Sequence, residues 1–148
     1  MKISKLFILI LVLLGLVGFA DSGYLTWKHY SGAPAACGII EGCDKVLASV
    51  YSTIGNLPVA AVGFWYYGLI LYLLVSYYRY QSVKILKIAA MFSVLGFLAS
   101  IWFLYLQIFV IGAFCFYCLI SAFSSAAIFS LLLFWWIKNT NLPNFYGK

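Results

Sequence analysis

Long uncharged stretches, separated by short segments that carry the polar and basic residues, dominate this chain of 148 residues. Four stretches are long enough to cross the hydrocarbon of a bilayer, which takes about 20 mostly apolar residues of α-helix. Two of them share one uncharged run, Ile88 to Ile137, which must fold back near Gly112 because a single helix of that length would exceed the bilayer. The pattern predicts spans at about residues 6–27, 58–78, 88–109 and 114–137.

The spans must be helical, because four such segments cannot close a β-barrel and lipid cannot satisfy open backbone groups. We therefore expect an all-α membrane protein, a four-transmembrane-helix bundle that forms a single domain over residues 1–148. Residues 28–57 make the one sizeable loop, predicted to lie outside the membrane. Within it, Asp44 to Thr53 is patterned as a short amphipathic helix that Gly55 and Asn56 would stop.

Composition supports a lipid environment, since 66% of the residues are hydrophobic and 8% are charged, against about 25% charged in soluble domains. The nine basic residues flank the spans without forming a stripe, which argues against nucleic-acid binding. If the N-terminus is cytoplasmic, only Lys28 and Lys45 of the nine lie outside. This bias predicts that both termini face the cytoplasm across the cell's inner membrane.

The first span could instead be a signal peptide, and it contains one unusual residue. Lys2 and Lys5 before an apolar run imitate a cleavable signal peptide, but apolar character resumes at residues 24–27, which favours an uncleaved span. Asp21 interrupts this span. Because a carboxylate is costly in lipid, we expect it near the outer boundary or facing the bundle interior.

All four cysteines fall on the predicted outer side, where disulfides persist. Cys37 and Cys43, here called the loop pair, lie in an aqueous loop that a soluble protein can reach. Cys115 and Cys118, the helix pair, form a C-x-x-C motif at the start of the last span. There the helix dipole stabilises a thiolate and makes the disulfide more oxidising. One pair in water and one near lipid is the arrangement of an electron relay to a lipid-soluble acceptor.

Three other interpretations of the cysteines compete with a relay. A non-catalytic structural membrane protein could hold two inert disulfides, and thiol reactivity would distinguish it from a relay. A zinc site is a poor fit because five residues separate the loop pair, so we expect no metal. Haem attachment needs His after C-x-x-C, and Leu119 stands there.

With these motifs in order, the chain resembles the vitamin K epoxide reductase family in its bacterial or archaeal form. The resemblance covers about residues 6 to 137. The DsbB-type quinone reductases place their C-x-x-C before the loop pair, so the order here disfavours them. The matching stretches are Tyr24–Trp27, Cys43–Ser49, Leu57–Ala60 with Gly63, Tyr105–Gln107 and Cys115–Ala122.

The resemblance implies an enzyme, a thiol-disulfide:quinone oxidoreductase that supports disulfide formation outside the cytoplasm. It implies that Cys115 and Cys118 are the active-site pair, with Cys118 beside the quinone, and that the loop pair shuttles electrons. A thioredoxin-fold (DsbA-like) protein would supply electrons and ubiquinone or menaquinone would accept them. Only about ten residues follow the last span, so this partner is expected to be a separate protein.

The resemblance also bears on the quinone site. Ser49 falls on the family's Ser/Thr position implicated in that site. Ala122 replaces the tyrosine of animal-type members, so a respiratory quinone is expected rather than vitamin K epoxide. Phe116 stands where prokaryotic members often have Pro, which is expected to shift the redox potential. Among many packing aromatics, the further candidates for the quinone site are Asn56, Phe114 and Trp65.

Overall fold

The computed structural model describes residues 4–32 and 42–140, apart from the side chain of Asp44. Four of its helices are long and apolar enough to cross a membrane. The chain is therefore a membrane protein, and the predicted four-helix bundle is confirmed. The spanning helices are α1 (Lys5–Ser31), α3 (Val59–Tyr80), α4 (Val83–Tyr105) and α5 (Phe116–Thr140).

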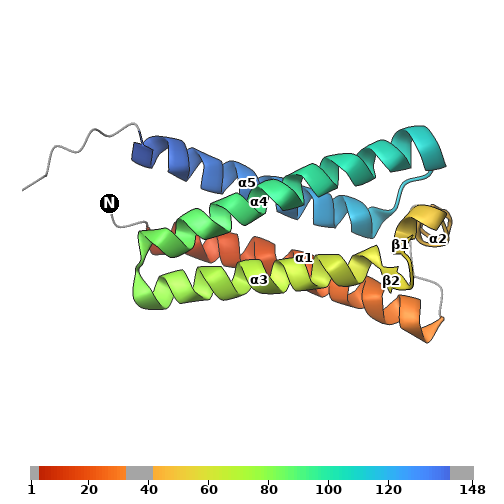
Figure 1. The fold of residues 1–148 in the computed structure, drawn as a ribbon, viewed down its shortest axis with the longest axis horizontal. Coiled ribbons are helices and arrows are strands. Elements are labelled where there is room, and N and C mark those ends of the chain that lie inside the picture. Colours follow the sequence, from red (N-terminus) through yellow and green to blue (C-terminus); the bar gives the residue numbers. More distant parts are fainter. Residues whose placement is uncertain (1–3, 33–41, 141–148) are drawn as a thin grey trace, which may run out of the picture.

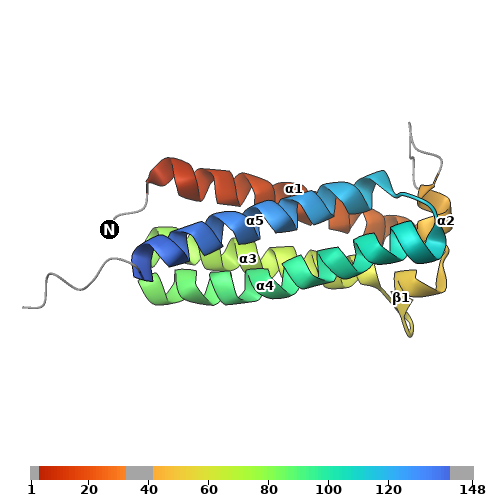
Figure 2. The ribbon, with the colours of Figure 1, turned by 90° about the horizontal axis from the view of Figure 1, so that it is seen from above.

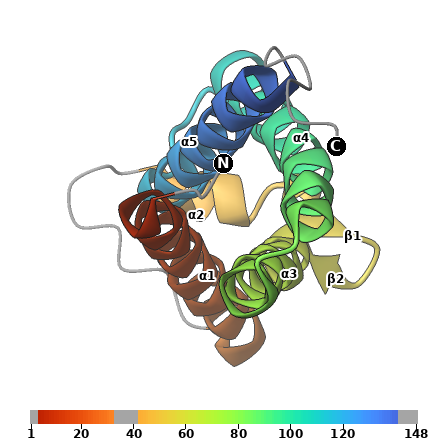
Figure 3. The same ribbon diagram turned by 90° about the vertical axis from the view of Figure 1, so that its left-hand side faces the viewer.

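The four long helices follow one another around a ring in the order α1, α3, α4, α5 (Figure 3), so each packs against two neighbours. Fully buried leucines and isoleucines such as Leu11, Ile70 and Leu86 fill the middle of the bundle. Large apolar side chains also cover the outside, as lipid-facing helices require. The short helix α2 (Cys43–Leu47) and a small hairpin lie at the end of the bundle away from the N-terminus (Figure 1).

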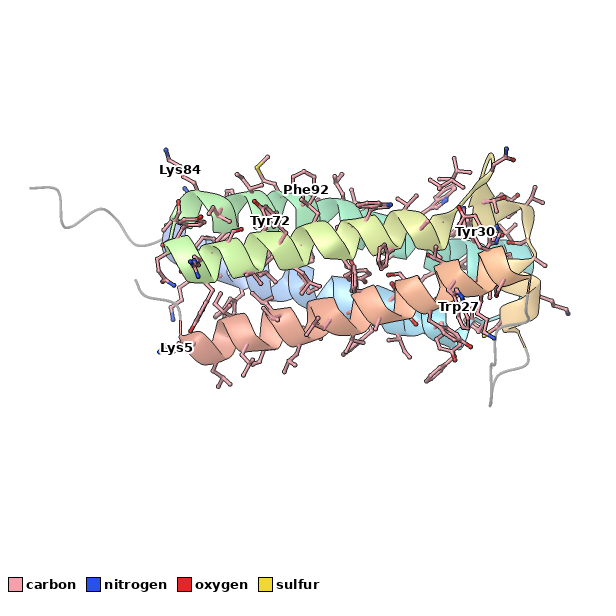
Figure 4. The ribbon with its side chains drawn as sticks, turned by 90° about the horizontal axis from the view of Figure 1, so that it is seen from below. Lys5, Trp27, Tyr30, Tyr72, Lys84 and Phe92 are labelled. Carbon is pink, nitrogen blue, oxygen red and sulfur yellow. The ribbon has the colours of Figure 1, made fainter. Side chains whose placement is uncertain are left out.

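Most of the basic residues lie at one end of the bundle. Lys5 and Lys84 lie at one end, and Trp27 and Tyr30 at the other (Figure 4). Because successive helices alternate in direction, Arg79 and Lys138 in the last turns of α3 and α5 belong to the Lys5 end. Helix α4 begins at Val83, before the expected residue 88. Lys84 and Lys87 fit in its first turns because their long side chains can place the charged groups at the end of the bundle.

The loop is less helical than its pattern predicts. Helix α2 ends at Leu47, and a 3₁₀ turn η1 (Val50–Ser52) and the strands β1 (Thr53–Ile54) and β2 (Leu57–Pro58) follow. Ser49 has an extended backbone, and its hydroxyl donates to the Val46 carbonyl at 2.7 Å, a local bond that competes with helix continuation. Gly55, at a φ of 65°, forms the hairpin turn and does not stop a helix.

Candidate active site

Cys115 and Cys118 lie at the start of α5 as two free thiols. The Cys115 side chain is fully buried, and that of Cys118 is partly buried. A hydrogen bond from the Cys118 thiol lowers the pKa of Cys115 to about 7, against burial, which raises it. The backbone N–H groups of Cys118 and Tyr117 contribute to the same lowering, and the value of about 7 is the net result of all these effects. Thiolate stabilisation is therefore concentrated on the first cysteine, at the helix N-terminus.

Gln107 fixes the backbone of Cys115 from the preceding helix. Helix α4 continues as a π-helical segment, η2 (Leu106–Ile111), which ends at Gly112 with a φ of 63°. Gln107 is 2% exposed, and its side-chain oxygen accepts the Cys115 N–H at 2.9 Å. Short π-helical segments are frequent at functional sites. The segment that ends at the predicted fold-back, Gly112, therefore also holds the start of the helix pair through Gln107.

Cys43 lies at the start of α2 and is disulfide-bonded. Its partner position in the predicted loop pair, Cys37, lies outside the described residues. Cys43 is 1% exposed and belongs to one buried cluster with Val46, Ala113 and Cys115. Figure 2 shows α2 beside the connection between α4 and α5. The fold thus brings a cysteine of the loop into one buried cluster with the first cysteine of the helix pair.

Gly42 makes this approach possible. A Cβ atom at this position would lie 2.5 Å from the carbonyl oxygen of Phe114 and 3.0 Å from its backbone nitrogen. Both neighbours are backbone atoms, which cannot rotate away as a side chain can. Only glycine lets the start of α2 pack this closely on the segment that carries Cys115.

A cavity of about 570 Å³ lies between the four long helices and α2. Its size falls within the roughly 300–1,000 Å³ of small-molecule sites. Most of its walls are apolar, with side chains such as Leu25, Val62, Phe92 and Phe103. Cys118 lines it, as does Gln107. The second cysteine of the helix pair therefore faces a space that suits an apolar ligand.

A few polar side chains interrupt the apolar walls. Asp21 is 8% exposed, and neither of its carboxylate oxygens has a hydrogen-bond partner in the described structure. It lies within the bundle interior, one of the two places that the sequence allows. The hydroxyls of Tyr66 and Ser125 come together beside Gly96, where a Cβ would contact both. Such isolated polar groups in an apolar cavity orient a bound ligand.

The structure places the candidate quinone-site residues in two groups. Ser49 and Trp65 line the cavity, Trp65 at its exposed rim. Asn56 lies in the exposed turn of the β1–β2 hairpin, and Phe114 is 44% exposed beside the helix pair; neither lines the cavity. Three residues that the sequence did not mark as site residues are Asp21, Gln107 and Gly42. The motif Tyr105–Gln107 was the sequence signal available for Gln107, and a charge inside a span was the signal available for Asp21.

The lowered pKa of Cys115 predicts a measurable titration. In a background with Cys37→Ser and Cys43→Ser, only the helix pair remains, and thiolate absorbance should rise with a midpoint near pH 7. Adding Cys118→Ala removes the donor that stabilises the thiolate, so the midpoint should move up toward the ordinary value of 9.0. An unchanged midpoint would show that the Cys118 hydrogen bond does not control Cys115.

The fold and the site define a class: a four-helix membrane protein in which a free C-x-x-C pair lies between a disulfide-bonded cysteine and an apolar cavity. The sequence model of the vitamin K epoxide reductase family matches residues 9–133. The chain belongs to this family.

One curated relative adds to this assignment. The chain is 34% identical over 119 residues to the thiol-disulfide oxidoreductase LTO1 of Arabidopsis thaliana. The match covers 75% of this chain and 32% of that protein. The matched region is thus about a third of the length of its relative.

Proposed function

We propose that this protein is a thiol-disulfide oxidoreductase that passes electrons from a thioredoxin-fold dithiol, through the loop pair and the helix pair, to a quinone. One observation carries the proposal. Cys115 packs in one buried cluster with Cys43, while its hydrogen-bond partner Cys118 lines the cavity. Each cysteine of the helix pair therefore faces one neighbour in an electron relay.

The relay consists of thiol–disulfide exchanges. A thiolate of the partner attacks Cys37 of a Cys37–Cys43 disulfide and releases Cys43. The Cys43 thiolate attacks Cys115 of an oxidised helix pair and releases Cys118. The partner's second thiol then attacks the mixed disulfide, which completes the partner's own disulfide and releases Cys37. Cys37 re-forms its bond with Cys43 and releases Cys115, whose pKa of about 7 makes it a good leaving group.

Two electrons have then moved from the partner to the helix pair. The resulting state has a closed loop pair and two free thiols in the helix pair. The structure is consistent with this state, because Cys43 is disulfide-bonded while Cys115 and Cys118 are free. The free helix pair also disfavours the alternative of a structural protein with two inert disulfides.

The cavity suits a quinone as the electron acceptor. Its apolar walls fit the ring and the isoprenoid tail, and its few polar groups fit the two ring oxygens. Ser49 and Trp65, with Tyr66 and Ser125, are the residues that would hold the ring. A bound quinone would accept two electrons and two protons. Cys118 would lie next to it, because this thiol lines the cavity.

The charge distribution supports an orientation in the cell's inner membrane. The basic residues at the Lys5 end favour the cytoplasmic side for both termini, which leaves α2 and the cysteines outside. The electron donor would then be a thioredoxin-fold protein of that compartment. We take residues 1–148 as one domain of this kind.

Purified protein in lipid vesicles tests the proposed function directly. A reduced thioredoxin-fold protein is added with a ubiquinone or menaquinone analogue, and the loss of quinone absorbance is followed. We expect one quinone to be reduced for each disulfide formed in the partner. If the partner's thiols and the helix pair stay reduced in the presence of either quinone, the protein does not carry out this reaction.

A further inference from the structure

Oxidation of a dithiol by a quinone moves protons as well as electrons, and the protein must carry them through an apolar cavity. The two thiols lose two protons and two electrons, and the two ring oxygens gain them. Proton transfer by a positioned side chain typically contributes about 10²–10⁴-fold to a rate. The cavity therefore needs a proton-carrying group that lies close to Cys118 and faces the ligand.

Asp21 has the position and the environment of such a group. It lines the same cavity as Cys118, and it interacts electrostatically with both Cys115 and Cys118. Within residues 4–32 and 42–140, its buried carboxylate has no hydrogen-bond partner. An ionised carboxylate in such a place is costly, and the cost falls when a proton or a ligand's hydrogen-bond donor arrives.

The neighbouring polar groups do not satisfy Asp21. The hydroxyl of Ser22 donates to the Gly18 carbonyl at 2.6 Å. The hydroxyl of Tyr67, from α3, donates to the Ser121 carbonyl at 2.6 Å. Both donors are thus committed elsewhere, and the carboxyl group of Asp21 stays available to the cavity.

We propose that Asp21 is the proton-transfer residue of the helix pair. This inference rests on the proposed function. In the step, the S–H bond of Cys118 breaks, the Sγ atoms of Cys115 and Cys118 join, and the electron pair passes to the acceptor. Asp21 donates its proton to a quinone oxygen, forming an O–H bond, and takes up the proton that Cys118 releases. The second proton is the one that Cys115 loses on ionising, exchanged with solvent. One dithiol and one quinone become one disulfide and one hydroquinone.

Single-turnover experiments separate this role from the relay. In the first half-reaction, the reduced partner reduces an oxidised helix pair, and trapping of the new Cys115 and Cys118 thiols measures the rate. In the second, the pre-reduced protein is mixed with a quinone analogue, and the loss of quinone absorbance measures the rate. We expect Asp21→Asn, which is nearly isosteric, to slow the second about 100-fold or more, with the first changed by less than threefold. Asp21→Glu, which keeps the carboxyl group, should recover at least a tenth of the wild-type rate.

Quinone affinity and the pH profile test whether the effect is structural. Asp21→Asn should bind the analogue within threefold of the wild type, measured by tryptophan quenching, and should lose one limb of the pH profile of the second half-reaction. Other titratable groups near Asp21 remain in the variant. They include Tyr66 and Tyr67 of α3, Tyr117 and Cys118 of α5, Cys115, and Tyr24 and His29 of α1.

The outcomes are distinct. If the wild type itself does not reduce the quinone, the proposed function fails. If it does, and Asp21→Asn keeps the full rate, or loses both half-reactions together, or loses only affinity, Asp21 does not carry the proton.

Discussion

Replacing Cys118 by serine is expected to lower steady-state quinone reduction by about a thousandfold or more, because the lost atom is one of the two that must form the disulfide. A serine hydroxyl fits the same space but cannot be oxidised to a disulfide with Cys115. The loop pair is untouched by this change, and its Cys43 packs in one buried cluster with Cys115. It should therefore still exchange with the partner, which trapping of its thiols would show.

Ser130 offers a matched control on the same helix, since its side chain is exposed and donates only to the Ala126 carbonyl at 2.8 Å. Ser130→Ala should reduce the quinone at the wild-type rate. Quinone reduction by Cys118→Ser at the rate of this control would rule out Cys118 as the electron donor.

Replacing Gly42 by alanine is expected to slow the transfer from the loop pair to the helix pair by about 100-fold, the effect of a displacement near 1 Å between reacting groups. The added Cβ would lie 2.5 Å from the Phe114 carbonyl oxygen, so α2 or the segment that carries Cys115 must move. The chemistry at each pair stays intact. Oxidation of a pre-reduced helix pair by the quinone should therefore keep its rate, while overall turnover with the partner falls.

Gly68→Ala is the control for this variant. It also adds one methyl group to a glycine, but its Cβ would lie 3.4 Å from the nearest atom of Phe19, an ordinary contact, and Gly68 is not part of the cavity wall. We expect Gly68→Ala to turn over with the partner and the quinone at the wild-type rate. Should Gly42→Ala transfer electrons between the pairs as fast as Gly68→Ala, close approach at Gly42 is not what couples them.

The spans and the fold-back could be predicted because lipid imposes a length and an apolar composition on every crossing. Gly112 was identified as the reversal for the same reason, and its left-handed backbone agrees. The start of α4 was missed because lysines can extend a helix beyond its apolar part. The loop helix was overestimated because the hydrophobic pattern does not reveal that Ser49 and Ser52 bond to nearby carbonyls.

The site was predictable at its cysteines and less so around them. A C-x-x-C motif fixes its own geometry at a helix start, whereas the lining of a cavity depends on how each helix is rotated. Ser49 and Trp65 line the cavity, but Asn56 is drawn into a hairpin that the sequence did not suggest. For Asp21 the sequence left two locations open, and only the packing of α1 in the bundle places it inside.

Direct exchange between Cys43 and Cys115 is the step on which the proposed relay depends most. The double variant Cys37→Ser with Cys118→Ser leaves these two cysteines as the only thiols. Under mild oxidation in lipid vesicles, we predict that they form an intramolecular disulfide in nearly all molecules, identified by mass after non-reducing digestion. Two free thiols, or bonds only between separate molecules, would contradict the relay.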